Sequence, residues 1–158
     1  MKIFERRDLM NTSLVTFKSN FMLIVILLFF ATPINTHASK EPVPDTIDGT
    51  TKISAEDLIN LINETPDLIV IDSRMDDRPQ GYIEDSISLP DVDTSCDSLS
   101  KHIKTKSTPV AFYCNGVKCG RSVVAARIAL KCGYTKIYWY RNGFMDWKEK
   151  GYPYITTK

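Results

Sequence analysis

The residues best suited to chemistry are a cysteine at position 114 and the loop of glycine and cationic residues that follows it. The stretch reads Val110-Ala-Phe-Tyr-Cys114-Asn-Gly-Val-Lys-Cys119-Gly-Arg-Ser122. A short apolar run after Pro109 is typical of a buried parallel strand, which would place Cys114 at the carboxyl end of that strand. Ligands of α/β sheets bind beyond such ends. The position favours a functional cysteine, and the alternative is a small buried side chain that only packs.

The loop after this cysteine is expected to stabilise negative charge. Residues 122–133 predict a helix ended by a glycine, so the loop lies at the amino end of that helix, where unpaired N–H groups and the helix dipole favour anions. Lys118 and Arg121 add positive charge, and Gly116 and Gly120 are expected to adopt positive φ and turn backbone amides inward. Each of these features lowers the pKa of a cysteine, and the thiolate is the reactive form. We therefore predict a nucleophilic thiolate in an anion-binding loop.

The rest of the chain predicts the domain that would position this loop. Strands are expected at Ile53 and over residues 68–72, 86–89, 110–113 and 136–140, which are short runs of apolar and aromatic side chains. Helices are expected from the capping box of Ser54 and Asp57 up to Pro66, and over residues 98–103, 122–132 and 144–150. This alternation predicts an α/β fold, with a central, mainly parallel five-stranded sheet flanked by helices on both faces.

The first 38 residues have the pattern of a secretory signal peptide. Residues 21–31 form an eleven-residue apolar run with basic residues before it and Thr36-His37-Ala38 after it. A membrane-spanning helix needs roughly 20 apolar residues, so we expect cleavage after Ala38 and a periplasmic or secreted protein, with an uncleaved membrane anchor as the alternative. Residues 39–49 contain two prolines and are expected to be a loose linker, which leaves residues 50–158 as the domain.

Charge and histidine content exclude several classes of function. The chain has 20 basic and 19 acidic residues, and removing the four basic and two acidic residues of the signal leaves a net charge of about −1. There is no polybasic segment that favours nucleic acid. His102 is the only histidine left, so we expect no metal site and no cofactor. An oxidising compartment permits disulfides, and Cys96 and Cys132 are interpreted as structural or incidental.

Three separated motifs within residues 50–155 resemble those of a rhodanese domain, a sulfurtransferase fold. The first is Val70-Ile-Asp-Ser-Arg74, followed by Gly81-Tyr-Ile-Glu-Asp-Ser-Ile-Ser-Leu-Pro90. The second is the loop from Cys114 to Ser122. The third is the aromatic strand and turn Tyr138-Trp-Tyr-Arg-Asn-Gly-Phe144 with Trp147 in the helix that follows. Their order and spacing identify the region as similar to a single-domain rhodanese.

This resemblance implies that Cys114 accepts a sulfane sulfur as a persulfide. The donor would be a small anion such as thiosulfate, and the acceptor a thiol, a protein thiol included, or a cyanide-like molecule. The sulfur and the donor would be held by the loop residues Asn115, Gly116, Val117, Lys118, Cys119, Gly120 and Arg121. Asp72 and Arg74 match a structural signature of the family and are expected to order the loop at the strand end. We expect a monomer.

The loop departs from the rhodanese pattern in two ways, and both leave other functions open. Six residues separate Cys114 from Arg121, whereas the commonest rhodanese loop has four. Relatives with longer loops are phosphatases and arsenate reductases, so an oxyanion enzyme is one alternative. Cys119 is the second departure. It could pair with Cys114 in a thiol-disulfide redox protein, resolve a persulfide or sulfenate on Cys114, or be a passive small residue.

Overall fold

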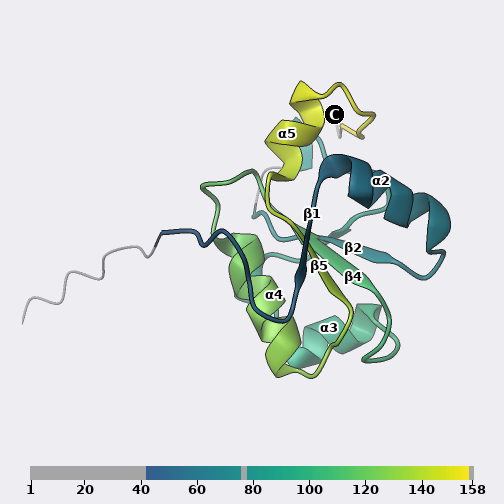
Figure 1. Ribbon diagram of the computed structural model, residues 1–158, viewed down its shortest axis with the longest axis vertical. Coiled ribbons are helices and arrows are strands. Elements are labelled where there is room, and N and C mark those ends of the chain that lie inside the picture. Colours follow the sequence, from purple (N-terminus) through teal and green to yellow (C-terminus); the bar gives the residue numbers. More distant parts are fainter. Residues whose placement is uncertain (1–41, 76–77, 157–158) are drawn as a thin grey trace, which may run out of the picture. The chain divides into compact units, whose positions relative to one another are not determined.

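The computed structural model describes residues 42–75 and 78–156, and the predicted signal peptide lies outside them. Their centre is a five-stranded sheet in which all neighbouring strands are parallel, in the order β1-β5-β4-β2-β3 (Figure 1). The predicted fold class is therefore confirmed. The strands are β1 (Thr51–Ile53), β2 (Ile69–Asp72), β3 (Ile87–Ser88), β4 (Val110–Tyr113) and β5 (Ile137–Tyr140).

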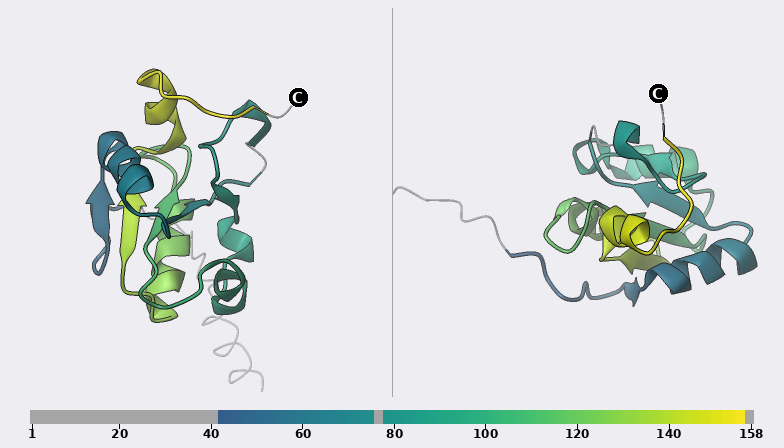
Figure 2. Two further views of the ribbon diagram at one scale, coloured as in Figure 1. Left: turned by 90° about the vertical axis from the view of Figure 1, so that its right-hand side faces the viewer. Right: turned by 90° about the horizontal axis from the view of Figure 1, so that it is seen from above.

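Helices cover both faces of this sheet, as the two turned views in Figure 2 show. Alternate residues of β4 divide the core, because successive side chains of a strand point to opposite faces. Val110 and Phe112 pack with α3 and α4, whereas Ala111 and Tyr113 pack with α2 and α5. The helices are α2 (Ala55–Glu64), α3 (Cys96–His102), α4 (Arg121–Lys131) and α5 (Gly143–Glu149), with short 3₁₀ turns η1 (Arg78–Gln80) and η2 (Asp91–Asp93).

Serine caps fix where two of the helices begin. The predicted capping box of Ser54 and Asp57 is confirmed at the start of α2. Helix α3 begins earlier than the residues 98–103 expected from the sequence, because Ser95 caps it and exchanges hydrogen bonds with Ser98. Cys96 is consequently the first residue of α3, where it forms a disulfide with Cys132 at the end of α4.

The segment expected to be a loose linker is packed onto the domain where it is described. Ile47 is 5% exposed and belongs to the core on the α3 and α4 face of the sheet. Arg141 donates a hydrogen bond from Nε to the carbonyl oxygen of Pro44 at 2.9 Å and pairs with Asp45 at 3.0 Å. Burial of one large apolar side chain contributes about 1.5–3 kcal/mol toward ordering this segment, which composition alone does not reveal. Within the described residues, no helix has the length and apolar character needed to cross a bilayer.

Candidate active site

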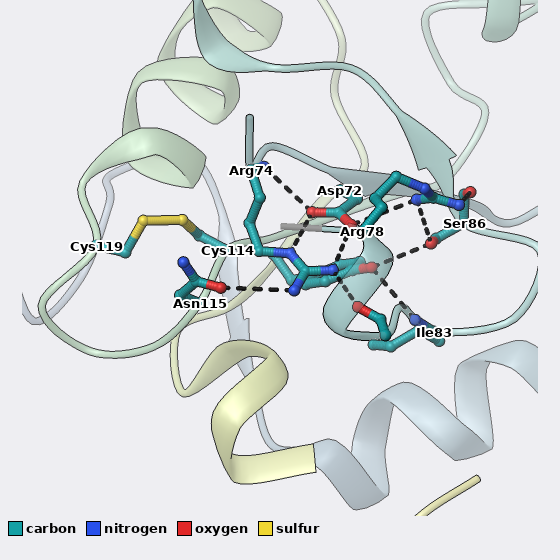
Figure 3. A network of polar contacts seen from close by, with 10 residues as sticks. Asp72, Arg74, Arg78, Ile83, Ser86, Cys114, Asn115 and Cys119 are labelled. Carbon is teal, nitrogen blue, oxygen red and sulfur yellow. Dashed lines mark hydrogen bonds and ion pairs between the residues drawn. A yellow bond between two sulfur atoms is a disulfide. The ribbon is translucent and has the colours of Figure 1, made fainter. Parts of the chain in front are cut away.

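Cys114 lies immediately after β4 and is joined to Cys119 by a disulfide, drawn in yellow in Figure 3. The Cα atoms of the two residues are 6.2 Å apart. Cys114 is only 2% exposed, whereas Cys119 is partly exposed. The expected position of Cys114 at a strand end is therefore found, and the structure brings the second loop cysteine into covalent contact with it. The sequence left this pairing as one of three readings of Cys119.

A tight turn returns the chain from Cys114 to Cys119. The amide of Cys119 donates a hydrogen bond to the carbonyl oxygen of Gly116 at 2.8 Å, which closes a four-residue turn. The prediction that Gly116 and Gly120 adopt positive φ is wrong, since neither does and Gly120 has φ −80°. A turn with negative φ at its central residues reverses the chain equally well, so the loop does not need left-handed glycines.

The left-handed glycine that the loop does need lies in another element. Gly143, the first residue of α5, has φ +66°, and a Cβ added there would lie 2.8 Å from the carbonyl carbon of Asn115 and from the nitrogen of Gly116. This close approach lets the amide of Phe144 donate to the carbonyl oxygen of Cys114 at 2.8 Å. The amide of Met145 donates to that of Asn115 at 2.9 Å. The start of α5 therefore fixes the backbone that follows the cysteine.

Asp72 and Arg74, which the rhodanese resemblance marks as supporting residues, form a buried ion pair beside the loop (Figure 3). Arg74 donates from Nε to Oδ1 of Asp72 at 2.8 Å and from Nη2 to Oδ2 at 2.7 Å. Its Nη1 lies 3.5 Å from Oδ1 of Asn115, and its guanidinium stacks over the Phe144 ring at 4.4 Å. Burial works against the charged form of Arg74, but the hydrogen bonds and charge of Asp72 outweigh it and raise the pKa. The pair thus connects the end of β2 to the residue after Cys114.

Three further residues complete this network, and the sequence analysis missed them. Arg78 donates to Oδ2 of Asp72 at 3.3 Å and to Oγ of Ser86 at 3.2 Å. The hydroxyl of Tyr113 lies 3.0 Å from the same Ser86 hydroxyl and accepts from the amide of Ile83 at 3.3 Å. Burial, followed by the charge of Asp72, raises the pKa of Tyr113 well above its usual value, so its hydroxyl stays protonated. Only the position of Tyr113 directly before the cysteine signalled a role in the sequence.

The two cations of the loop lie in different surroundings. Arg121 is the first residue of α4, and its Nη1 forms an ion pair with Oδ1 of Asp91 at 3.0 Å. Lys118 and Val117 are exposed at the tip of the turn. The carboxylate of Asp91 offsets the charge of Arg121, whereas Lys118 has no ion-pair partner among the described residues and the amino end of α4 adds its partial positive charge. No group of three or more metal-binding side chains lies together among residues 42–75 and 78–156.

The site therefore consists of two bonded cysteines in the loop between β4 and α4, next to a buried polar network centred on Asp72. In the reduced state, Cys114 would be a shielded cysteine in the loop that leads to the amino end of α4, which favours a thiolate, and Cys119 would be a more accessible thiol beside it. Such a pair can take up a group on one sulfur and release it by forming the disulfide.

Comparison with known proteins places this arrangement in a family. Residues 54–150 match the model of the rhodanese-like domain. A protein of Bacillus halodurans shares 21% identity at a TM-score of 0.61, over 68% of this chain and 78% of that chain. A rhodanese-related protein of Thermoplasma volcanium shares 25% identity at a TM-score of 0.55, over 68% of this chain and 99% of that chain. The homodimeric polysulfide-sulfur transferase of Wolinella succinogenes shares 21% identity at a TM-score of 0.56, over 70% of this chain and 81% of that chain. No curated protein matches the chain.

Proposed function

Because the chain belongs to the family of rhodanese-like domains, we propose that it is a sulfurtransferase that carries a sulfane sulfur on Cys114. Family membership supports sulfur transfer in general. The observation that carries the assignment to this residue is the placement of Cys114 just after β4, in the loop that leads into the amino end of α4. There the helix dipole and unpaired amides favour the thiolate and the anionic donor alike.

The transfer divides into two displacement steps at one sulfur atom. The Cys114 thiolate attacks the sulfane sulfur of an anionic donor, and the donor leaves with the electron pair of the broken bond, as sulfite does from thiosulfate. The product is a Cys114 persulfide. An acceptor nucleophile, a thiolate or cyanide, then attacks the outer sulfur and releases Cys114 as thiolate. Lys118 and the backbone of the loop would hold the donor, and the Asp72–Arg74 pair would keep the loop in place.

A second function, thiol-disulfide exchange, is favoured by one specific observation, the disulfide between Cys114 and Cys119. In this form the Cys114 sulfur is bonded to Cys119 and is not the thiolate that attacks a donor, so a sulfurtransferase must first be reduced. A redox protein would instead use the disulfide itself as its oxidant. Phosphate or arsenate chemistry, the third possibility, has weaker support because the Arg121 side chain is paired with Asp91.

The two functions are distinguished by thiocyanate production from thiosulfate and cyanide after reduction of the protein. We expect turnover by the wild type and none by Cys114→Ser, whose hydroxyl cannot form a persulfide. Intact mass of reduced Cys119→Ser after thiosulfate treatment should show one added sulfur atom, because this variant keeps Cys114 and has no second thiol in the loop. Turnover by Cys114→Ser, or a Cys119→Ser variant that takes up no sulfur together with a reduced wild type that forms no thiocyanate, would contradict the proposal.

The matched control replaces the other pair of cysteines. Cys96→Ser with Cys132→Ser removes the disulfide between the start of α3 and the end of α4, at the opposite end of α4 from the loop. This double variant should keep thiocyanate production while losing stability, which separates loss of the nucleophile from loss of a cysteine. Circular dichroism confirms that each variant is folded.

The cellular location proposed with this function is an oxidising compartment reached through the signal-like residues 1–38. Two disulfides in the described residues support it, because such bonds form and persist outside the cytoplasm. Expression of the full chain in bacteria, followed by fractionation and sequencing of the mature amino terminus, tests this. We expect a periplasmic protein that begins at Ser39; recovery of the full-length chain in the membrane fraction would instead support the uncleaved anchor.

A further inference from the structure

We propose that Cys119 is a second catalytic residue, which releases the sulfur from the Cys114 persulfide as sulfide and thereby makes a dithiol the true reductant of the reaction. This inference rests on the proposed sulfurtransferase function and names its acceptor. The observation behind it is the bond between the two Sγ atoms in the structure. Cys119 reaches the atom that would bear the sulfane sulfur within the fold as described.

The loop is built so that this contact is local. The turn closed by the Cys119 amide and the Gly116 carbonyl brings Cys119 back beside the strand end within five residues. At the same time, the amides of Phe144 and Met145 hold the carbonyls of Cys114 and Asn115. One cysteine is therefore anchored from the side of α5 and the other is carried on the turn. Two thiols held this close react as an intramolecular pair, which favours them over a dilute external thiol.

The chemical step balances without any further reactant. The Cys119 thiolate attacks Sγ of Cys114 in the protonated persulfide, the bond between the two Cys114 sulfurs breaks, and the outer sulfur leaves as HS⁻ with the bonding electron pair. The disulfide forms, and the sulfane sulfur is reduced to sulfide at the expense of the two cysteines. Thiol-disulfide exchange follows the same course, with attack by a thiolate on one sulfur and departure of the other.

The difference in exposure between the two cysteines determines how the cycle continues. Cys114 is 2% exposed and Cys119 is partly exposed, so an external thiolate can approach only Cys119. Attack there forms a mixed disulfide and expels Cys114 as a thiolate, the form that the helix amino end favours. The second thiol of the reductant then frees Cys119 and leaves as an intramolecular disulfide. A dithiol completes both steps in one encounter, so we assign the reductant to that class, and each turnover oxidises one dithiol and releases one sulfide.

A single-turnover experiment tests the release step. Wild type and Cys119→Ser are reduced, freed of reductant, and given one equivalent of thiosulfate or of inorganic polysulfide without oxygen. Wild type should release one sulfide per molecule and end with the Cys114–Cys119 disulfide. Cys119→Ser should keep the sulfur on Cys114 and release sulfide at least roughly tenfold more slowly, because it lacks the neighbouring thiol.

The outcomes separate this inference from the function on which it rests. If both proteins acquire sulfur on Cys114 and hold it equally long, Cys119 is not a releasing residue, whereas the sulfurtransferase proposal stands. If neither protein acquires sulfur from either donor, both proposals fall. Peptide mapping distinguishes these products, because cleavage after Lys118 places the two cysteines on separate peptides.

A second experiment tests the site at which the reductant attacks. Oxidised wild type is treated with glutathione, a monothiol that forms a mixed disulfide with one cysteine in its first step. Free thiols are then alkylated after a short time, before a second glutathione molecule completes the reduction. We expect glutathione on Cys119 and the alkyl group on Cys114. Glutathione found mainly on Cys114 would overturn the assignment of Cys119 as the point of attack.

Discussion

Asp72 shows how much of the site depends on a single buried charge. Its carboxylate is fully buried and accepts hydrogen bonds from two arginines, Arg74 with a side chain 1% exposed and Arg78 with one 22% exposed. A buried carboxylate is tolerated only when its charge is compensated within hydrogen-bonding distance. The bidentate pair with Arg74 provides most of this compensation, and the same guanidinium contacts Asn115 and Phe144. Arg74, which compensates the buried charge at the end of β2, thus also positions the loop after Cys114.

Replacing Arg74 should therefore be much more damaging than replacing Arg78. Arg74→Met removes the buried partner and is expected to lower the free energy of unfolding by about 3–5 kcal/mol, since it leaves an uncompensated charge. Arg78→Met removes a longer and more exposed contact and should lower it by about 1 kcal/mol. Urea denaturation measures both values. Equal losses in the two variants would show that the carboxylate does not depend mainly on Arg74.

Ser73, unlike Asp72, is a buried polar residue whose side chain has no hydrogen-bond partner among the described residues. The residue is fully buried. An unsatisfied buried hydroxyl lowers stability by about 1–3 kcal/mol. Ser73→Ala should consequently leave the free energy of unfolding unchanged or raise it by about 1 kcal/mol. A decrease of that size on urea denaturation would mean that the hydroxyl is bonded in solution.

At the scale of elements, the packing of α5 against the cysteine loop should be sensitive to one added methyl group. Gly143→Ala places a Cβ against the backbone of Asn115 and Gly116 and also forces a left-handed conformation on alanine. We expect a loss of more than about 2 kcal/mol and a lower rate of thiocyanate formation, because the loop must shift. Thermal unfolding and the activity assay measure the two effects.

Gly151 provides the matched control, since it has φ +72° and nothing within 4 Å of an added Cβ. Gly151→Ala introduces the same conformational strain without the collision and should lose about 1–2 kcal/mol. Its activity should stay at the wild-type level because Gly151 lies after α5 and away from the loop. If the two variants behave alike, the close approach at Gly143 is not what holds the loop.

The two disulfides should also differ in their effect on stability. In the chain-entropy model, the stabilisation by a cross-link increases with the length of the loop that it closes. Cys96 and Cys132 are 36 residues apart and Cys114 and Cys119 only five, which corresponds to about 4 and about 2 kcal/mol. The double variant Cys96→Ser with Cys132→Ser should therefore unfold at a lower temperature than the double variant Cys114→Ser with Cys119→Ser. A larger loss from opening the short loop would indicate strain or contacts beyond chain entropy.

For the whole molecule, the sequence predicts what depends on local patterns and fails where distant segments meet. The five strands and the position of Cys114 follow from apolar runs and turn residues, so the order of elements could be predicted. The pairing of Cys96 with Cys132 could not, because spacing does not determine disulfide connectivity. The role of Gly143 depends on a loop almost thirty residues earlier in the chain. Arg78 likewise gains its role through the buried Asp72, and Ser86 gains its role through Arg78 and Tyr113.

One such long-range contact should make the stability of the domain depend on pH. Glu56, at the start of α2, accepts hydrogen bonds from Lys150 at 2.9 Å and from Tyr152 at 2.8 Å, which connects α2 to the carboxyl-terminal segment. The hydrogen bond from Lys150 is the largest cause that lowers the pKa of Glu56 to about 2. An acid with a lowered pKa stabilises the folded state above its usual pKa near 4.5, and this contribution is lost as pH falls toward 2.

The expected result is a difference between wild type and Glu56→Gln that depends on pH. At pH 7, Glu56→Gln should lower the midpoint of thermal unfolding by a few degrees at most, because the carboxylate is exposed and its ion pair is screened by solvent. The difference should shrink from pH 4.5 downward and disappear near pH 2, where the wild-type carboxyl is also neutral. Glu64→Gln, at the other end of α2 and outside every ion pair in the described part of the chain, serves as the control. A difference for Glu56→Gln that stays constant between pH 7 and 2 would show that the carboxylate charge does not carry the contact.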